Sequence, residues 1–135
     1  MTPGKWFEQK FEKSVTCFIQ RLSVKNKKEM CDFLVFDSVM LYGCECKSYD
    51  SNTIPIHKDH IKDHQIDGLA DMIKHKNCLG LFFLNFRKSE KIYVVSANYL
   101  RVLRDKKAKS ISIKQAKANH ITPVTMKWIN SDFFK

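Results

Sequence analysis

The fold is decided by the stretch DFLVFDSVMLYGCECK, which runs from Asp32 to Lys47. Aromatic and β-branched residues dominate its first part, and we predict one strand from Asp32 to Met40. A second strand is predicted from Leu41 to Lys47, joined to the first by a tight turn near Ser38–Leu41. Two strands connected in this way are expected to pair as a hairpin.

Glu45 and Lys47 stand two residues apart on the second strand, so both side chains leave the same face. Cys44 and Cys46 then point to the other face, where a small apolar residue suits a core. A carboxylate and an ammonium on the open face suit phosphodiester cleavage, in which the carboxylate holds Mg²⁺ and the ammonium steadies the attacking water or the charge on phosphorus. Asp32 is placed to be the second metal ligand. Glu-x-Lys on a strand is more often a solvated ion pair, and an aspartate before a strand is often a turn residue, so these alternatives stay open.

Hydrophobic periodicity predicts the elements around this hairpin. The predicted helices cover 6–22, about 60–75 and 98–104, with a weak helix near 113–118, and the further strands cover 78–86 and 91–95. Basic residues 26–28 are read as a turn or loop, and polar residues 48–58 as a loop. The order α-β-β-α-β-β-α predicts an α/β fold with a mixed central sheet flanked by helices.

The length of 135 residues favours one domain. We expect a single nuclease domain over 1–135, with a core over about 4–105 and a basic segment over 106–135 whose fold the pattern does not define. The longest nearly continuous apolar run, Cys78 to Leu84, is too short to span a membrane. Charged residues interrupt the N-terminal segment, which argues against a signal peptide and favours the cytoplasm. Five cysteines fit reduced core thiols better than a disulfide framework.

The charge of the chain favours a polyanionic partner. Lys and Arg total 24 against 14 acids, which gives a formal net charge of +10 and a pI near 9.5. Basic side chains follow the first predicted helix and gather again near the end of the chain, at Lys25, Lys27, Lys28, Arg101, Arg104, Lys106, Lys107 and Lys109. Such a surface suits DNA phosphates, although a run of charge is often only a solvated face.

The hairpin and its surroundings together resemble the PD-(D/E)XK nucleases, and more narrowly the RecU-type Holliday junction resolvases and their small phage relatives. Besides 32–37 and 41–47, the resemblance rests on GKWFE at 4–8 with Ser14, on IPI at 54–56 with HQI at 64–66, and on GLFFLNF at 80–86. It covers about Gly4 to Val95, in order and at similar spacing. It implies a restriction-endonuclease-like core, a metal-dependent endodeoxyribonuclease that cuts four-way DNA junctions by symmetric nicks, and a homodimer, since two cuts need two sites.

Carried over by position, the resemblance makes Asp32 and Glu45 the metal carboxylates and Lys47 the catalytic lysine. Cys46 would add its backbone carbonyl to the metal, which is expected to be Mg²⁺ or Mn²⁺. Glu8 matches an acidic residue on the first helix that approaches the metal directly or through water. Met30-Cys31 departs from the family's usual pair of proline and a small residue before the aspartate, which loosens the expected entry of the strand but removes no catalytic group.

Gln65 matches a glutamine near the family's site, and the helical pattern marks it independently. Ile61 and Leu69 lie four residues to either side, so the amide falls beside or within the apolar face of its helix. A buried amide needs a hydrogen-bond partner. Either the edge of an active site or nearby backbone would supply one.

The predicted DNA contacts are basic or polar residues of the first helix and of the loops: Lys5, Ser14, Arg21, Lys27, Lys28 and Lys58. Two alternatives to a junction resolvase stay open, a nuclease of the same superfamily with a repair or restriction-like substrate and a non-catalytic DNA-binding protein on the same fold. A zinc site at His57, His60 and His64 is disfavoured, because Cys44-x-Cys46 is a poor chelate. A cysteine nucleophile is disfavoured because Cys44 and Cys46 are predicted to face the core.

Overall fold

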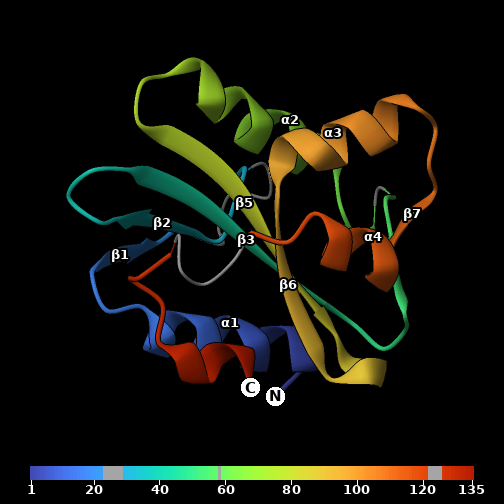
Figure 1. The fold of residues 1–135 in the computed structure, drawn as a ribbon, viewed down its shortest axis with the longest axis horizontal. Helices are drawn as coiled ribbons and strands as arrows, with labels where there is room; N and C mark the ends of the chain where they lie inside the picture. The colour runs from blue at the N-terminus through green and yellow to red at the C-terminus, as the bar shows by residue number, and fades with distance from the viewer. Residues whose placement is uncertain (23–28, 58, 122–125) are drawn as a thin grey trace.

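A five-stranded mixed sheet forms the centre of the computed structural model, which describes residues 1–22, 29–57, 59–121 and 126–135. The strands lie in the order β1-β2-β3-β5-β6 (Figure 1). Their bounds are β1 Phe18–Arg21, β2 Phe33–Phe36, β3 Leu41–Tyr49, β5 Cys78–Phe86 and β6 Lys91–Ser96. Only β3 and β5 pair in parallel; β1–β2, β2–β3 and β5–β6 are antiparallel. The predicted mixed sheet is confirmed.

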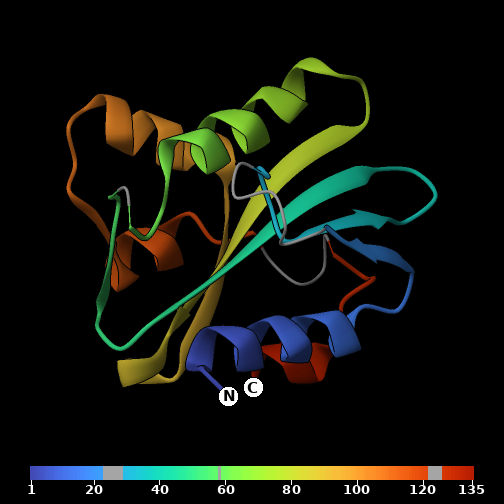
Figure 2. The same ribbon diagram turned by 180° about the vertical axis from the view of Figure 1, so that it is seen from behind.

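Helices cover both faces of this sheet, as Figures 1 and 2 show. Helix α1 (Pro3–Ser14) lies on one face, and α2 (Asp63–Asp71), with the 3₁₀ turn η1 (Met72–Lys74), lies with α3 (Ala97–Asp105) on the other. A small second sheet pairs β4 (Thr53–Pro55) with β7 (Ser110–Ser112), and α4 (Ile113–Ala118) follows it. Two further 3₁₀ turns in the described residues are η2 (Arg87–Ser89) and η4 (Ser131–Phe134).

Each face of the sheet has its own hydrophobic core. Under α2 and α3, the buried side chains include Ile66, Leu69 and Leu100. Under α1, Phe7 and Phe11 pack with aromatic residues from the sheet and from the last part of the chain, among them Trp128 and Phe133. Burial of their aromatic rings fixes Trp128 and Phe133 against the sheet, although the sequence pattern of the basic segment 106–135 predicted no defined fold.

The first helix is shorter than predicted. It begins where the Thr2 hydroxyl accepts a hydrogen bond from the Lys5 amide at 3.2 Å and Pro3 fills the first turn. It ends at Ser14, not at residue 22, and Phe18–Arg21 form the edge strand β1 instead. The apolar stripe predicted a continuous helix because Phe18 continues its spacing. Aromatic and β-branched residues also suit a strand. As a strand, β1 pairs with the outer edge of β2 and provides hydrogen-bond partners for the backbone groups there.

The predicted hairpin is present with a shorter first strand. β2 ends at Phe36 because Asp37 turns the chain: its Oδ1 accepts from the amides of Val39 and Met40 at 3.0 and 2.7 Å. Ser38 takes a φ of 73° in the same turn. Asp37 therefore has a structural role in this turn.

The middle of the chain follows the prediction with three corrections. β5 has the predicted bounds, and β6, α3 and α4 differ from theirs by at most one residue at an end. The predicted helix over 60–75 begins at Asp63 and gives way to η1 after residue 71, and the predicted loop over 48–58 contains the end of β3 and all of β4. β7 was also missed, because three residues carry too little periodicity to be recognised.

Gly80 explains how closely α2 approaches the sheet. A Cβ built at this position of β5 would lie 2.1 Å from the Leu69 carbonyl oxygen. Only glycine permits this contact between strand and helix. The approach brings the N-terminal half of α2 over β3, where Glu45 lies. In the parts of the chain that the structure describes, no helix is long and apolar enough to cross a membrane.

Candidate active site

Asp32 and β3 are joined by two hydrogen bonds at the open end of the β2–β3 hairpin. The Asp32 amide donates to the Cys44 carbonyl at 3.1 Å, and Asp32 Oδ2 accepts from the Cys46 amide at 2.9 Å. The pairing of β2 with β3 ends at Phe33 and Cys44. Beyond this pair, the Cys46 amide donates to the Asp32 carboxylate instead of to a backbone carbonyl of β2. Asp32 is thereby held against the strand that carries Glu45, as the hairpin hypothesis required.

Glu45 lies under α2 and is 3% exposed. Its Oε2 accepts from Gln65 Nε2 at 3.1 Å and lies 3.2 Å from Lys47 Nζ. Its Oε1 is buried, and no described residue offers it a hydrogen bond. One carboxylate oxygen is thus held in place by two donors, and the other has no hydrogen-bond donor among the described residues.

The prediction that Glu45 and Lys47 lie on an open face is wrong. The two do share a face, with Cys44 and Cys46 on the opposite one, but α2 covers that face and leaves the Lys47 side chain 17% exposed. The reason is the close packing of α2 against β5 at Gly80. The site is therefore shielded from solvent by α2, and water screens its charges weakly.

Gln65 supplies the link from α2. It is 9% exposed, its Nε2 donates to Glu45, and its Oε1 accepts from the Lys62 amide at 3.3 Å. Both sources of a partner considered from the sequence, the site and nearby backbone, are therefore used. With both ends of the amide bonded, the direction of the NH₂ group toward Glu45 is fixed.

Burial dominates the electrostatics of the two carboxylates. Removal from water raises the pKa of Glu45 to about 8, and the charge of Asp32 raises it further while Lys47 opposes the rise. Burial likewise raises the pKa of Asp32 to about 6, against the hydrogen bond from the Cys46 amide. Because both carboxylates have raised pKa values and lie close together, a bound cation would stabilise their ionised forms.

A third carboxylate reaches the same edge from the other face of the sheet. Glu8 of α1 lies near enough for its charge to raise the pKa of both Asp32 and Glu45. Arg21, at the end of β1, binds Glu8 Oε1 at 3.1 Å and Glu12 Oε1 at 2.9 Å. In a continuous helix Glu8 and Arg21 would stand roughly 20 Å apart, so sequence reasoning missed this pair.

The donor set fits a divalent cation with oxygen ligands. The Cys44 carbonyl accepts from the Asp32 amide and so faces β2. Backbone carbonyls two residues apart on a strand point to the same side, so the Cys46 carbonyl points to this edge as well. Together with Asp32 and the free Oε1 of Glu45, it offers the few hard oxygens that Mg²⁺ takes while keeping several waters. Within the described ranges, no group of three or more His, Cys, Asp or Glu side chains is arranged to hold a metal ion. Hydrated Mg²⁺ does not need such a group.

The predicted DNA contacts have different surroundings. Lys5 is exposed on α1, and Arg21 is engaged by Glu8 and Glu12. Ser14 is buried, with its hydroxyl donating to the Phe11 carbonyl at 2.6 Å, so we leave it out of the DNA-contacting surface proposed below. Lys27, Lys28 and Lys58 lie outside the described residues.

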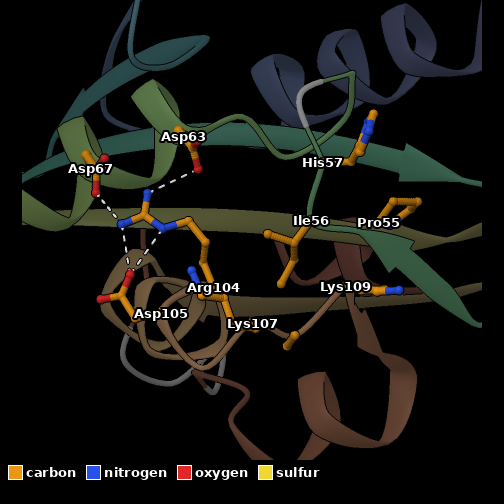
Figure 3. A pocket seen from close by; sticks show the side chains of 10 residues that line it. Pro55, Ile56, His57, Asp63, Asp67, Arg104, Asp105, Lys107 and Lys109 are labelled. Atoms are coloured by element: carbon orange, nitrogen blue, oxygen red, sulfur yellow. Dashed lines mark hydrogen bonds and ion pairs between the residues drawn. The ribbon is translucent and has the colours of Figure 1, made fainter.

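A second group of charges lies on the far side of α2, around the pocket in Figure 3. Arg104 binds Asp67 at 2.8 Å, Asp105 at 3.1 Å and Asp63 at 3.3 Å, and Arg101 binds Asp71 at 2.9 Å. The interpretation of these two arginines as DNA contacts is not supported, because aspartates of α2 and α3 occupy them. The carboxylates here are bound to arginines, so the pocket in Figure 3 does not have the character of a metal site.

Cysteine chemistry also finds little support. Cys44 and Cys46 are buried in the core under α1, and burial raises the pKa of both thiols well above the usual range. A nucleophilic cysteine needs the opposite shift, since only the thiolate attacks.

Comparison with known proteins gives a family and a fold. A family model described as RecU, Recombination protein U, matches residues 5–131. Among solved structures, Hjc of Archaeoglobus fulgidus, described as a Holliday junction resolvase from an archaeal hyperthermophile, is similar with a TM-score of 0.60 and 12% sequence identity, covering 93% of this chain and 99% of that chain. At that identity the likeness shows the fold alone. No curated protein matches the chain.

Proposed function

The chain belongs to the Recombination protein U family, and from this premise and the geometry of its site we propose that it is a Holliday junction resolvase that uses Mg²⁺, or Mn²⁺ in its place. Such an enzyme is an endodeoxyribonuclease that hydrolyses phosphodiesters at four-way DNA junctions. The observation that carries the proposal is the buried Glu45 carboxylate, which has one oxygen held by Gln65 and Lys47 and the other without a partner among the described residues.

Asp32, Glu45 and the Cys46 carbonyl would hold the cation at the end of the β2–β3 hairpin. When bound, the cation supplies charge that offsets the phosphate and lowers the pKa of a coordinated water. Burial raises the pKa of Asp32 to about 6 and that of Glu45 to about 8, so both carboxylates would gain from a bound cation. Glu8, which is bound to Arg21, would contact the cation directly or through water.

The chain's own side chains perform the remaining tasks. Lys47 presents an ammonium beside Glu45, where it stabilises the negative charge that grows on the phosphate oxygens as water attacks phosphorus in line. Gln65 is a positioning residue, because its hydrogen bond fixes the rotation of the Glu45 carboxylate. α2 excludes bulk water from the pair, which strengthens each of these interactions.

The same proposal extends to the assembly and setting of the enzyme. Two symmetric nicks require two sites, so we infer a homodimer of single nuclease domains, each formed by residues 1–135. Exposed Lys5 and the basic residues Lys27, Lys28 and Lys58 would contact phosphates around the site. We also propose that the protein acts on DNA in the cytoplasm of a bacterial cell and that it is encoded by a phage.

The experiment compares substrates. Synthetic four-way junctions, a duplex of one arm's sequence and a flap are end-labelled on each strand in turn and incubated with the protein and Mg²⁺. We expect cutting of the junction, with nicks at symmetry-related positions of two opposing strands, and little cutting of the duplex. Preferential cutting of the flap or duplex would instead assign a repair or restriction-like nuclease, and binding without any cutting would assign a non-catalytic DNA-binding protein.

A further inference from the structure

A groove at one end of the molecule brings an exposed aromatic ring together with several cations. Figures 1 and 2 show the start of α1, the η2 turn and residue 135 at this end. The groove has a volume of about 450 Å³ and is lined by side chains that include Trp6, Lys10, Asn85, Arg87, Glu90 and Lys135. Since residues 6 and 87 are far apart in the sequence, no pattern along the chain indicates that they meet.

Trp6 presents its ring to solvent in this groove. The residue is 51% exposed, whereas Trp128 is only 4% exposed. Lys10 packs against the Trp6 ring, with Nζ 5.4 Å from the ring centroid and 5.8 Å from that of Phe133. A cation held between the two rings orients the indole. An oriented and half-exposed indole is a platform on which a nucleobase can stack.

Arg87 is the arginine whose hydrogen-bonding needs the described residues do not meet. Its Nε is buried and has no hydrogen-bond partner among them, and none of their carboxylates forms an ion pair with it. The other three arginines, Arg21, Arg101 and Arg104, each bind at least two carboxylates. A buried donor without a partner is costly, and a guanidinium matches the oxygens of a phosphate.

The groove is linked to β3, the strand that carries Glu45 and Lys47. Asn85 Nδ2 donates to Ser48 Oγ at 3.3 Å, and Ser48 directly follows Lys47 on β3. On α1, Trp6 stands two residues before Glu8. The site and the groove lie on opposite faces of the sheet, yet Lys47 of the site and Asn85 of the groove are both near the carboxyl ends of the parallel strands β3 and β5. A DNA strand cut at Glu45 and Lys47 can therefore continue around this end of the sheet.

We propose that the groove binds one nucleotide of the DNA substrate, with its phosphate at Arg87 and its base stacked on Trp6. The nucleotide has left the base stack at the branch point, because a base within a duplex cannot present its face to an indole. This inference rests on the proposed function for its choice of DNA as the ligand.

Equilibrium binding in EDTA tests the groove without cutting. A fluorescein-labelled four-way junction is titrated with the parental protein and with Trp6→Ala, Trp6→Phe and Arg87→Ala. Lys117→Ala, at an exposed lysine of α4, is the matched control for lost charge. We expect Trp6→Ala and Arg87→Ala each to weaken binding about tenfold, and Trp6→Phe to restore most of the loss. Arg87→Ala should also reduce the slope of log affinity against log salt by roughly one, as loss of one phosphate contact does.

Intrinsic fluorescence gives a second readout. A base stacked on the exposed indole should quench the emission of Trp6 when unlabelled junction is added, and Trp6→Phe should abolish this change because Trp128 is buried. Binding by Trp6→Ala and Arg87→Ala within about twofold of Lys117→Ala would overturn the proposal, as would unchanged Trp6 emission on saturation. If the Trp6 and Arg87 variants bind the junction weakly but the parental protein cuts no junction, the proposed function is refuted and the nucleotide-binding groove is retained. If the parental protein cuts junctions and these variants bind them normally, the groove is refuted and the proposed function is retained.

Discussion

Replacing Glu45 by glutamine should make the metal-free protein more stable at pH 8 while removing its response to Mg²⁺. Burial raises the pKa of Glu45 from 4.5 to about 8. Between these values the folded state holds a proton that the unfolded state has lost, so the free energy of unfolding falls as pH rises through this window. Above pH 8 the loss is complete.

The size of the effect follows from the same pKa values. At about 1.36 kcal/mol per pH unit, the difference between 4.5 and about 8 sets an upper limit of about 5 kcal/mol. Coupling to Asp32 and Lys47 and local relaxation reduce this value, and we expect about 1–3 kcal/mol. Asp32 adds a smaller loss in the same direction between its ordinary pKa and about 6.

Urea denaturation at pH 5 and pH 8 in EDTA measures the difference. The parental protein should lose about 1–3 kcal/mol between the two pH values, and Glu45→Gln should lose clearly less. Asp50→Asn, at an exposed carboxylate, is the matched control and should follow the parental protein. Addition of Mg²⁺ at roughly ten times its dissociation constant should return about 1.4 kcal/mol to the parental protein and nothing to Glu45→Gln. A parental stability that rises from pH 5 to pH 8, or an equal gain from Mg²⁺ in Glu45→Gln, would refute the reasoning.

Four further predictions concern the support of the site and the surface around it. Gln65→Ala frees the carboxylate of Glu45 and should reduce the cleavage rate about 10–100-fold while raising the Mg²⁺ concentration needed for half-maximal rate; an unchanged Mg²⁺ dependence would remove Gln65 from the site. Gly80→Ala pushes a Cβ against the Leu69 carbonyl and should cost about 2–4 kcal/mol in urea denaturation, whereas a loss below about 0.5 kcal/mol would contradict the close contact of α2 with β5. Arg104→Gln removes a residue bound to aspartates, so it should lower the melting temperature while leaving junction affinity within about twofold; a large loss of affinity would return Arg104 to the DNA surface. DNA affinity should fall steeply between low and moderate salt through release of counterions from phosphates, and a flat response would exclude a role for the charge of +10.

The parts of the fold that sequence patterns predicted are those with an unambiguous local signal. The continuous apolar run of β5 is typical of a strand covered on both faces, and its bounds agree with the prediction. Gln65 was recognisable because an amide on an apolar helix face is rare and needs a partner. Asp32 and Glu45 were placed together by the predicted hairpin, and the structure brings them together through the bonds to Cys44 and Cys46.

The missed parts depend on contacts between distant segments. Phe18 continues the apolar spacing of α1, and only the open edge of β2 decides that it belongs to a strand. The cover that α2 places over Glu45 follows from the packing at Gly80, and helix packing cannot be read from a strand's own sequence. The groove at Trp6 and Arg87 joins residues that are far apart in the sequence, so no local pattern brings them together.

Cleavage of a synthetic four-way junction under single-turnover conditions tests the central claim most directly. The parental protein, Glu45→Gln, Lys47→Ala and the control Asp50→Asn are compared in Mg²⁺, with junction binding measured in parallel in EDTA. The parental protein and Asp50→Asn should cut at similar rates, while Glu45→Gln and Lys47→Ala should lose more than about a hundredfold in rate and still bind the junction. Cutting by Glu45→Gln at the parental rate would contradict the account, since the reaction would then take place without the carboxylate on which the site is built.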